Sequence, residues 1–296
     1  MSVVIVLGAE GFLGRHLVHH VAADPSGPHR VVGVDRHARG GGGSYAVDLR
    51  DDAAVGHLLR TERPDVVVNL AGVVEGTDDE LSEINVELPG RLMRMMASWP
   101  ETRDARLLLL GSAAEYGECD VAQDECAPLR PASAYGRSKL RQYERFRAVA
   151  DAGGQWVALA RPFNIVGPGM PRHLALASFA EQIAAAGGNE RIRTGNLSAV
   201  RDFLDVEDVV TALWHVVRRG RSGEVYNVSS GVGHSMRALV EMLVQLSGRE
   251  LTIDENTSAS AGVPVSVGSS EKLRRETGWA PRIPIATSLR RLLGQG

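Results

Sequence analysis

Tyr135 and Lys139 are the two side chains whose types and spacing first indicate chemistry. They are four residues apart, so on a helix they lie on the same face, one turn from each other. A phenol ordinarily titrates at about pH 10 and is a poor proton donor or acceptor at neutrality. A lysine ammonium one turn away stabilises the phenolate and is expected to lower the pKa of Tyr135 toward the range of general acid–base catalysis. The alternative is a surface tyrosine and lysine that have this spacing by chance.

A glycine-rich turn near the start of the chain is placed to hold a dinucleotide. Residues 3–7 are a β-branched apolar run that predicts a strand, and an amphipathic helix is predicted over 15–23. Between them, Gly8 can make a tight turn, Gly11 lets the backbone approach a pyrophosphate, and Gly14 allows the helix to pack closely on the strand. The N-terminus of the helix adds amide donors for phosphate oxygens.

The second predicted strand, over 31–34, ends at Asp35 and Arg36. A carboxylate at this position can accept hydrogen bonds from the adenosine ribose of NAD, whereas Arg36 could hold the 2′-phosphate of NADP. Because Asp35 would repel that phosphate, the sequence favours NAD and leaves NADP as the alternative.

Strands and helices alternate through the first half of the chain. Further apolar strands are predicted over 66–72, 107–110 and 157–160. This alternation predicts an α/β fold with a Rossmann-type, doubly wound parallel sheet. Ligands bind beyond the carboxyl ends of the strands in such a sheet, and Ser112, Tyr135 and Asn164 all lie just beyond predicted strand ends.

The pattern loosens after residue 170 and indicates a smaller C-terminal substrate-binding lobe. The elements expected there are a helix over 175–186, a helix opened by 200–208 and continuing to 217, a strand over 224–228 and a helix over 235–246. We therefore predict a dinucleotide-binding domain over 1–170, to which part of 200–232 returns, and a mainly substrate-binding lobe over 171–296.

The composition is that of an ordinary globular protein, with 296 residues, 44% hydrophobic, 23% charged, and a net charge of −3. Near-neutral charge argues against nucleic acid as a partner. No apolar run approaches the roughly 18 residues needed to cross a membrane. Cys119 and Cys126 are the only cysteines and have no histidine pair nearby, so no metal site is expected. Two cysteines and the absence of a basic leader favour a cytoplasmic location.

With these residues in place, the chain resembles the extended short-chain dehydrogenase/reductases, a family of nucleotide-sugar epimerases, dehydratases and reductases. The resemblance covers nearly the whole chain and rests on GAEGFLG (8–14), NLAG (69–72), GSAAEYG (111–117), YGRSK (135–139), RPFNIVGPG (161–169), VRDFLDVEDV (200–209), VYNVSSG (225–231) and GWAPRIPI (278–285).

The resemblance implies a role for each matching residue. Tyr135 would transfer the proton, Lys139 would bind the nicotinamide ribose and lower the pKa of Tyr135, and Ser112 would hydrogen-bond the same sugar oxygen. The cofactor would be held by Gly8, Gly11, Phe12, Leu13, Gly14, Asp35, Arg36, Asp48, Leu49, Leu70, Ala71, Gly72, Tyr135, Lys139 and Pro162, with Asp48 at the adenine. The substrate would be held by Ser112, Ala113, Tyr135, Asn164, Arg172 and Arg201, with Asn164 and Arg201 at its diphosphate.

The residues after Ser112 narrow the reaction. Family dehydratases carry an Asp-Glu pair there, whereas this chain has Ala113 and Ala114, which cannot act as acid or base. Epimerases acting at C3 and C5 need a further acid–base side chain, which Ala114 does not supply. The remaining reactions are reduction of a 4-keto group and 4-epimerisation. The motifs at 161–169 and 194–209 look most like those of the GDP-4-keto-6-deoxymannose reductases, so we favour a 4-ketoreductase, with a 4-epimerase as the alternative.

One departure from the family pattern concerns the substrate diphosphate. Family members usually have an arginine followed by proline near 263–264, and residues 259–262 here are Ala-Ser-Ala-Gly. Either Arg201 with a neighbour such as Arg172 binds the diphosphate, or the substrate is not a standard nucleotide diphosphate sugar.

Two further expectations concern assembly and class. The resemblance implies a homodimer formed by the Tyr135 helix and a helix over 82–99, whose methionines could belong to the core or face the partner. Some members of this fold are non-catalytic cofactor-binding regulators, and the presence of Ser112, Tyr135 and Lys139 argues against that class.

Overall fold

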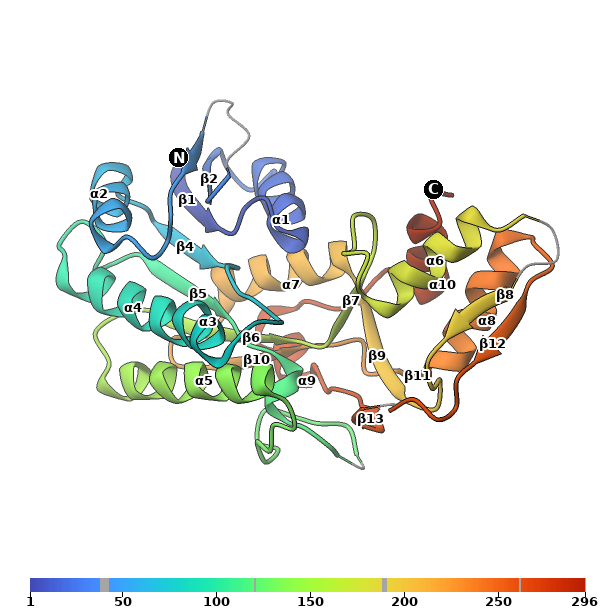
Figure 1. Ribbon diagram of the computed structural model, residues 1–296. Helices are drawn as coiled ribbons and strands as arrows, with labels where there is room; N and C mark the ends of the chain where they lie inside the picture. Colours follow the sequence, from blue (N-terminus) through green and yellow to red (C-terminus); the bar gives the residue numbers. More distant parts are fainter. Residues whose placement is uncertain (38–42, 120, 188–190, 261, 296) are drawn as a thin grey trace.

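A parallel seven-stranded sheet forms the larger part of the computed structural model, which describes residues 1–37, 43–119, 121–187, 191–260 and 262–295 (Figure 1). Its strand order is β10-β6-β5-β4-β1-β2-β3. The strands are β1 (Ser2–Leu7), β2 (His29–Asp35), β3 (Ser44–Ala46), β4 (Val66–Asn69), β5 (Arg106–Leu110), β6 (Val157–Pro162) and β10 (Val225–Val228). The predicted α/β fold with a Rossmann-type sheet is confirmed.

Helices cover both faces of this sheet, as its almost wholly apolar strands require. One face packs against α1 (Phe12–Ala22), α7 (Val206–Arg219) and α9 (Glu271–Thr277). The other packs against α2 (Asp52–Glu62), α4 (Leu88–Ser98) and α5 (Ala134–Ala152). Because α7, α9 and β10 come from the C-terminal half, the chain returns to the sheet after leaving it.

Two helices differ from their predicted bounds. α1 begins at Phe12, directly after the extended Gly11, and not near residue 15. The helix expected over 82–99 is three consecutive segments: α3 (Asp78–Ser82), a π-helical turn η1 (Glu83–Glu87), and α4. Thr77 begins α3 with a capping box to Glu80, a signal that places the start four residues earlier than expected.

Two of the three methionines of α4 lie in the core. Met93 and Met96 are 1% and 0% exposed and pack with β-strand side chains beneath α4. Of the two expected positions for this apolar face, the core and a partner contact, the core is confirmed for these two residues, because the sheet covers them.

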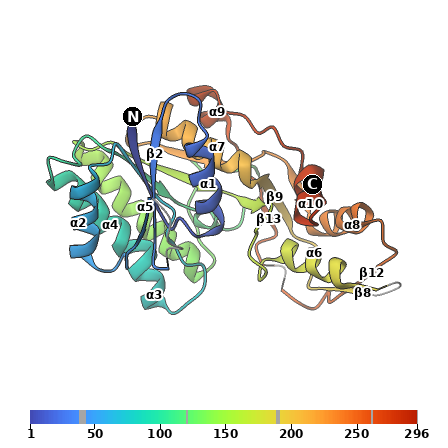
Figure 2. The ribbon, with the colours of Figure 1, turned by 90° about the horizontal axis from the view of Figure 1, so that it is seen from above.

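A smaller lobe lies beside the carboxyl ends of the strands (Figures 1 and 2). Its helices are α6 (Ala175–Ala185), α8 (Met236–Ser247) and α10 (Ile285–Leu292). They pack around a separate apolar cluster. Its strands are β7 (Asn164–Val166), β8 (Arg191–Thr194), β9 (Val200–Asp205), β11 (Gly233–Ser235), β12 (Thr252–Glu255) and β13 (Val265–Ser266).

β9 corrects the expectation that 200–208 opens a helix. Residues 200–205 are a strand that pairs with β7, β11 and β13, and only Val206 begins α7. The buried carboxylate of Asp202 accepts from the backbone amides of Ser230, Gly231 and Gly268, so partners distant in the sequence hold this segment extended. In the part of the chain that is described, no helix is long and apolar enough to cross a membrane.

Candidate functional site

The glycine turn between β1 and α1 has the close contacts that its sequence requires. Gly8 has φ +79°, and a Cβ there would lie 2.9 Å from the backbone nitrogen of Ala71. A Cβ on Gly14 would lie 2.1 Å from the carbonyl oxygen of Gly8. Only glycine allows this turn and this approach of helix to strand. The resulting cradle at the start of α1 fits a pyrophosphate.

A hollow of about 440 Å³ continues from the glycine turn along the carboxyl ends of β2 and β4. Its lining includes the predicted residues Gly8, Gly11, Asp35, Arg36, Asp48, Leu49, Leu70, Ala71 and Gly72. Asp35 accepts from the backbone nitrogen of Glu10 at 3.2 Å. The Arg50 guanidinium and backbone amide donate to Asp48 and hold the pKa of that carboxyl well below its usual range. Glycine cradle, carboxylates and apolar walls together fit an adenine dinucleotide.

The three predicted catalytic side chains come from two neighbouring elements. Ser112 follows β5 and begins the short 3-10 turn η2 (Ala113–Glu115), whose Ala114 amide donates to its hydroxyl at 3.1 Å. Tyr135 lies in the first turn of α5 and lines the same hollow as Ser112. Lys139 follows one turn later and is 4% exposed.

Lys139 does not act on the pKa of Tyr135 in the predicted way. Burial raises the pKa of Tyr135, and the neighbouring Ser112 side chain opposes that rise. The ammonium of Lys139 instead donates to the carbonyl oxygen of Leu110 at 2.7 Å and to Gln142 Oε1 at 2.9 Å. Burial lowers the pKa of Lys139 to about 8. Ser112 is therefore the side chain that favours ionisation of this phenol.

A π-helical turn connects α5, which carries Tyr135, to the loop after β4. Asn85, in η1, donates to the carbonyl oxygen of Val73 at 2.8 Å and to Ser138 Oγ at 3.0 Å, while its own carbonyl accepts from the Val73 amide. Ser138 in turn donates to the carbonyl oxygen of Tyr135 at 2.7 Å. π-helical turns often occur at functional sites, and this one aims a buried amide at the first turn of α5.

A second hollow, of about 290 Å³, lies over Ser112 and Tyr135. The predicted residues Ala113, Pro162, Asn164 and Arg201 line it as well. It meets a larger cavity of about 680 Å³ at Phe163, Asn164 and Arg201. That cavity also includes Gly8, Gly11, Phe12, Leu13, Gly14, Leu70 and Gly72, so it adjoins the dinucleotide hollow.

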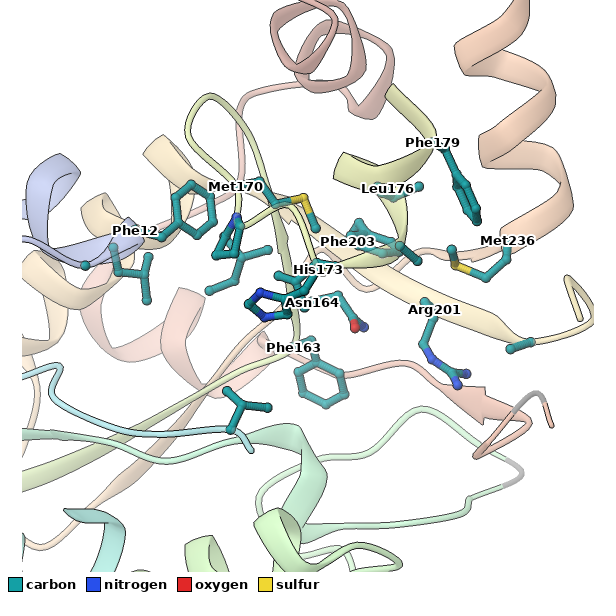
Figure 3. A pocket seen from close by; sticks show the side chains of 18 of the residues that line it. Phe12, Phe163, Asn164, Met170, His173, Leu176, Phe179, Arg201, Phe203 and Met236 are labelled. Carbon is teal, nitrogen blue, oxygen red and sulfur yellow. The ribbon is translucent and has the colours of Figure 1, made fainter. Parts of the chain in front are cut away.

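The large cavity runs between the sheet and the smaller lobe (Figure 3). Phe12 lies at one end, Asn164 and His173 near the middle, and Phe179 and Met236 at the other end (Figure 3). Arg201, from β9, donates to the carbonyl oxygen of Val200 at 2.9 Å, and burial lowers the pKa of Arg201. A partly desolvated guanidinium beside an elongated cavity suits an anionic ligand.

Arg172 is the one predicted substrate residue that the structure places elsewhere. Its side chain is exposed and pairs with Glu181 on α6 at 2.6 Å. It lines a separate hollow beside Leu292 and not the large cavity. The turn before α6 carries it past the cavity, and the neighbouring His173 faces the cavity instead.

The sequence did not identify the lining that the smaller lobe supplies. Leu176 and Phe179 come from α6, Asn196 and Leu197 from the loop after β8, and Met236 from α8. The spacing of Leu176 and Phe179 predicts an apolar helix face but does not distinguish a core from a cavity wall. Among the described residues, no three His, Cys, Asp or Glu side chains are grouped to hold a metal ion.

Comparisons with known proteins agree with this geometry. Residues 4–229 match the model of the NAD dependent epimerase/dehydratase family. The GDP-6-deoxy-D-mannose reductase of Pseudomonas aeruginosa is 32% identical over 302 residues, which cover 98% of this chain and 95% of that protein. The dTDP-6-deoxy-L-talose 4-dehydrogenase (NAD(P)(+)) of Kitasatospora kifunensis is 33% identical over 303 residues, covering 98% and 94%. A solved structure of RMD from Pseudomonas aeruginosa complexed with NADPH superposes with a TM-score of 0.86 at 29% identity, covering 100% and 98%.

Proposed function

Because the chain belongs to the NAD dependent epimerase/dehydratase family, we propose that it reduces the 4-keto group of a nucleotide-linked 4-keto-6-deoxyhexose. Its relatives of known name include NAD(P)-dependent nucleotide-sugar oxidoreductases, and the chain is an enzyme of that broad type. The observation that carries the finer proposal is the hollow lined by Ser112 and Tyr135, in which Ala113 and Ala114 lie beside these two side chains. Neither alanine can remove or add a proton, so Tyr135 is the proton donor for a ketone held there.

The roles of the side chains follow from their contacts. A reduced nicotinamide, when bound, supplies the hydride that the carbonyl carbon receives. Tyr135 gives its phenolic proton to the carbonyl oxygen, and the Ser112 hydroxyl hydrogen-bonds the same oxygen. Lys139, whose ammonium is buried one helical turn from Tyr135, would bind the ribose of the nicotinamide.

The substrate class is supported by the shape and charge of the large cavity. Arg201 and Asn164 lie where this cavity meets the hollow over Ser112 and Tyr135, and their side chains suit a diphosphate. Leu176, Phe179 and Met236 form an apolar end that suits a nucleobase. We propose GDP-4-keto-6-deoxymannose as the first sugar to test and NADH as the favoured cofactor, because Asp35 lies in the dinucleotide hollow. NADPH is the alternative cofactor.

A 4-epimerase is the second candidate, because it needs only hydride transfer and the same proton donor. It would oxidise C4, let the keto sugar turn, and reduce it again with the same cofactor. A non-catalytic cofactor-binding protein is the third candidate, and the position of Ser112 and Tyr135 in one hollow argues against it.

The deciding assay follows the absorbance of NADH and NADPH in parallel with GDP-4-keto-6-deoxymannose. Loss of absorbance in proportion to product is expected, and the faster cofactor identifies the preference. Flat absorbance with unchanged sugar would reject the GDP reductase; conversion of a saturated nucleotide sugar without net absorbance change would instead identify an epimerase. Tyr135→Phe should lose turnover by about 10²–10⁴-fold while cofactor affinity stays unchanged. Unchanged behaviour of that variant would support the non-catalytic reading.

A further inference from the structure

A buried ion pair lies directly beneath the catalytic serine. Glu115 and Arg161 are 0% and 1% exposed, and Arg161 Nε donates to Glu115 Oε2 at 2.7 Å. Neither residue lines the hollows described above. Removing two charges from water is costly, and such a pair often contributes little net stability compared with apolar side chains of the same volume. The contacts of the Glu115–Arg161 pair therefore indicate a role other than stabilising the fold.

The second carboxylate oxygen of Glu115 is bonded to the backbone of Ser112. The Ser112 amide donates to Glu115 Oε1 at 2.8 Å, and the Ser112 hydroxyl caps the same short turn, forming a reciprocal capping box. Gly111 makes room for this carboxylate, since a Cβ there would lie 2.7 Å from Glu115 Oε1. The orientation of the serine is thus tied to the orientation of Glu115.

Arg161 links that turn to the catalytic helix. Its guanidinium lies 4.5 Å from the ring centroid of Tyr143, on α5, and 5.0 Å from that of Tyr116. It also donates to the hydroxyl of Tyr116 at 3.1 Å, and Tyr116 donates to Asn227 Oδ1 at 2.7 Å. One buried cation therefore contacts the Ser112 turn, the helix that carries Tyr135, and a residue bonded to β10.

We propose that Glu115 is a positioning residue for Ser112, and that Arg161 holds Glu115 in the orientation that aims the serine hydroxyl at the reacting oxygen. Loss of this orientation should slow proton transfer while leaving the glycine cradle, and hence cofactor binding, intact. The effect on turnover rests on the proposed function; the effect on the Ser112 turn does not.

The test uses Arg161→Met and the double variant Glu115→Gln with Arg161→Met. The double variant removes both charges and keeps similar volumes, so no unpaired charge remains buried and the fold should be retained. Glu62→Gln is the matched control, because Glu62 is a carboxylate, 8% exposed, paired with Arg30 at the opposite edge of the sheet.

Hydrogen exchange of the peptide covering 111–117, measured by mass spectrometry, reports on the Ser112 amide without any substrate. We expect faster exchange confined to that peptide in both Arg161 variants, and no change there in the control. In turnover assays, kcat should fall on the order of 10²-fold with little change in KM or in cofactor Kd. The double variant should regain the thermal stability lost in Arg161→Met without regaining kcat.

Two results would overturn the inference: unchanged exchange of 111–117 in the Arg161 variants, or recovery of both stability and kcat in the double variant. If Arg161→Met does not fold, the double variant alone decides by the same readouts. If the unaltered enzyme turns over no nucleotide sugar, the proposed function fails, and hydrogen exchange still decides the positioning role.

Discussion

Lys139 has a buried ammonium that donates hydrogen bonds to two oxygen acceptors, Leu110 O and Gln142 Oε1. Because burial lowers its pKa from 10.5 to about 8, the unfolded chain binds more protons than the folded chain between those values. The free energy of unfolding should therefore rise with pH across that interval, by roughly 3 kcal/mol for this one group.

Urea denaturation of the unaltered protein and Lys139→Met, from pH 8 to pH 10.5, measures this contribution as a difference between the two proteins. The unaltered protein should gain stability relative to the variant as pH rises. A constant difference would show that the folded chain does not depress the pKa of Lys139.

Asp35 is the residue at which cofactor preference should be decided. Its carboxylate lies in the dinucleotide hollow with Arg36, and the Glu10 amide holds it there. Asp35→Ala should weaken NADH binding about tenfold, by loss of hydrogen bonds to a charged acceptor, and should weaken NADPH binding less or not at all. Cofactor titrations by tryptophan fluorescence or calorimetry measure both. Asp51→Ala, which removes only the cap of α2, is the control and should leave both affinities unchanged. An unaltered NADH to NADPH ratio in Asp35→Ala would contradict the assignment.

At the scale of elements, the distance between α5 and η2 sets the geometry of Ser112 and Tyr135. Gly136 permits the contact, because a Cβ there would lie 2.4 Å from the carbonyl oxygen of Ala114. Gly136→Ala should destabilise the fold by about 1–3 kcal/mol, although alanine is the better helix former, and should lower kcat roughly tenfold or more.

Gly90→Ala is the matched control for that prediction. Gly90 is also helical, but the nearest atom to its added Cβ is the movable end of Arg145, at 2.9 Å. It should be neutral or slightly stabilising, with unchanged kcat. Thermal unfolding and steady-state kinetics of both variants provide the comparison. Equal stability and equal kcat in the two variants would show that the α5–η2 contact can accommodate an added methyl group.

Elements that local pattern determines were predicted well, and those that distant contacts determine were not. The apolar runs of β1, β4 and β5 indicated strands correctly, because a strand buried on both faces has few polar residues. The local pattern of β9 instead predicts the opening of a helix, since its polar Arg201 and Asp202 resemble a helix start. The partners of Asp202 at 230–231 and 268 make it a strand, and no local pattern shows them.

At the scale of the molecule, the sequence placed Ser112, Tyr135 and Asn164 at one edge because parallel strands end together. It could not place Arg172, whose direction depends on the turn before α6, or the cavity wall from the smaller lobe, whose position depends on packing between lobes. Glu115 and Arg161 were within recognised motifs, but their pairing across 46 residues is visible only in the fold.

The family resemblance predicts a homodimer through α4 and α5. With Met93 and Met96 covered by the sheet, the interface would use the outer surfaces of these helices, which carry the exposed Arg94, Arg137 and Arg141. Light scattering should give twice the chain mass at low salt. Arg141→Glu should then weaken association if that surface is used, while Arg218→Glu, on α7 at the opposite face, should not. A single-chain mass across the concentration range would reject the dimer.

The position of β10 at the edge of the large sheet has a consequence for how the chain is made. While a ribosome extends the chain at about 5–20 residues per second, β6 is complete several seconds before β10 exists, and its outer edge has no strand to pair with. Asn227, which accepts a hydrogen bond from the hydroxyl of Tyr116, is also made only when β10 is synthesised. A nascent chain that already has its glycine cradle and Tyr135 therefore carries an open, aggregation-prone strand edge until translation reaches residue 228.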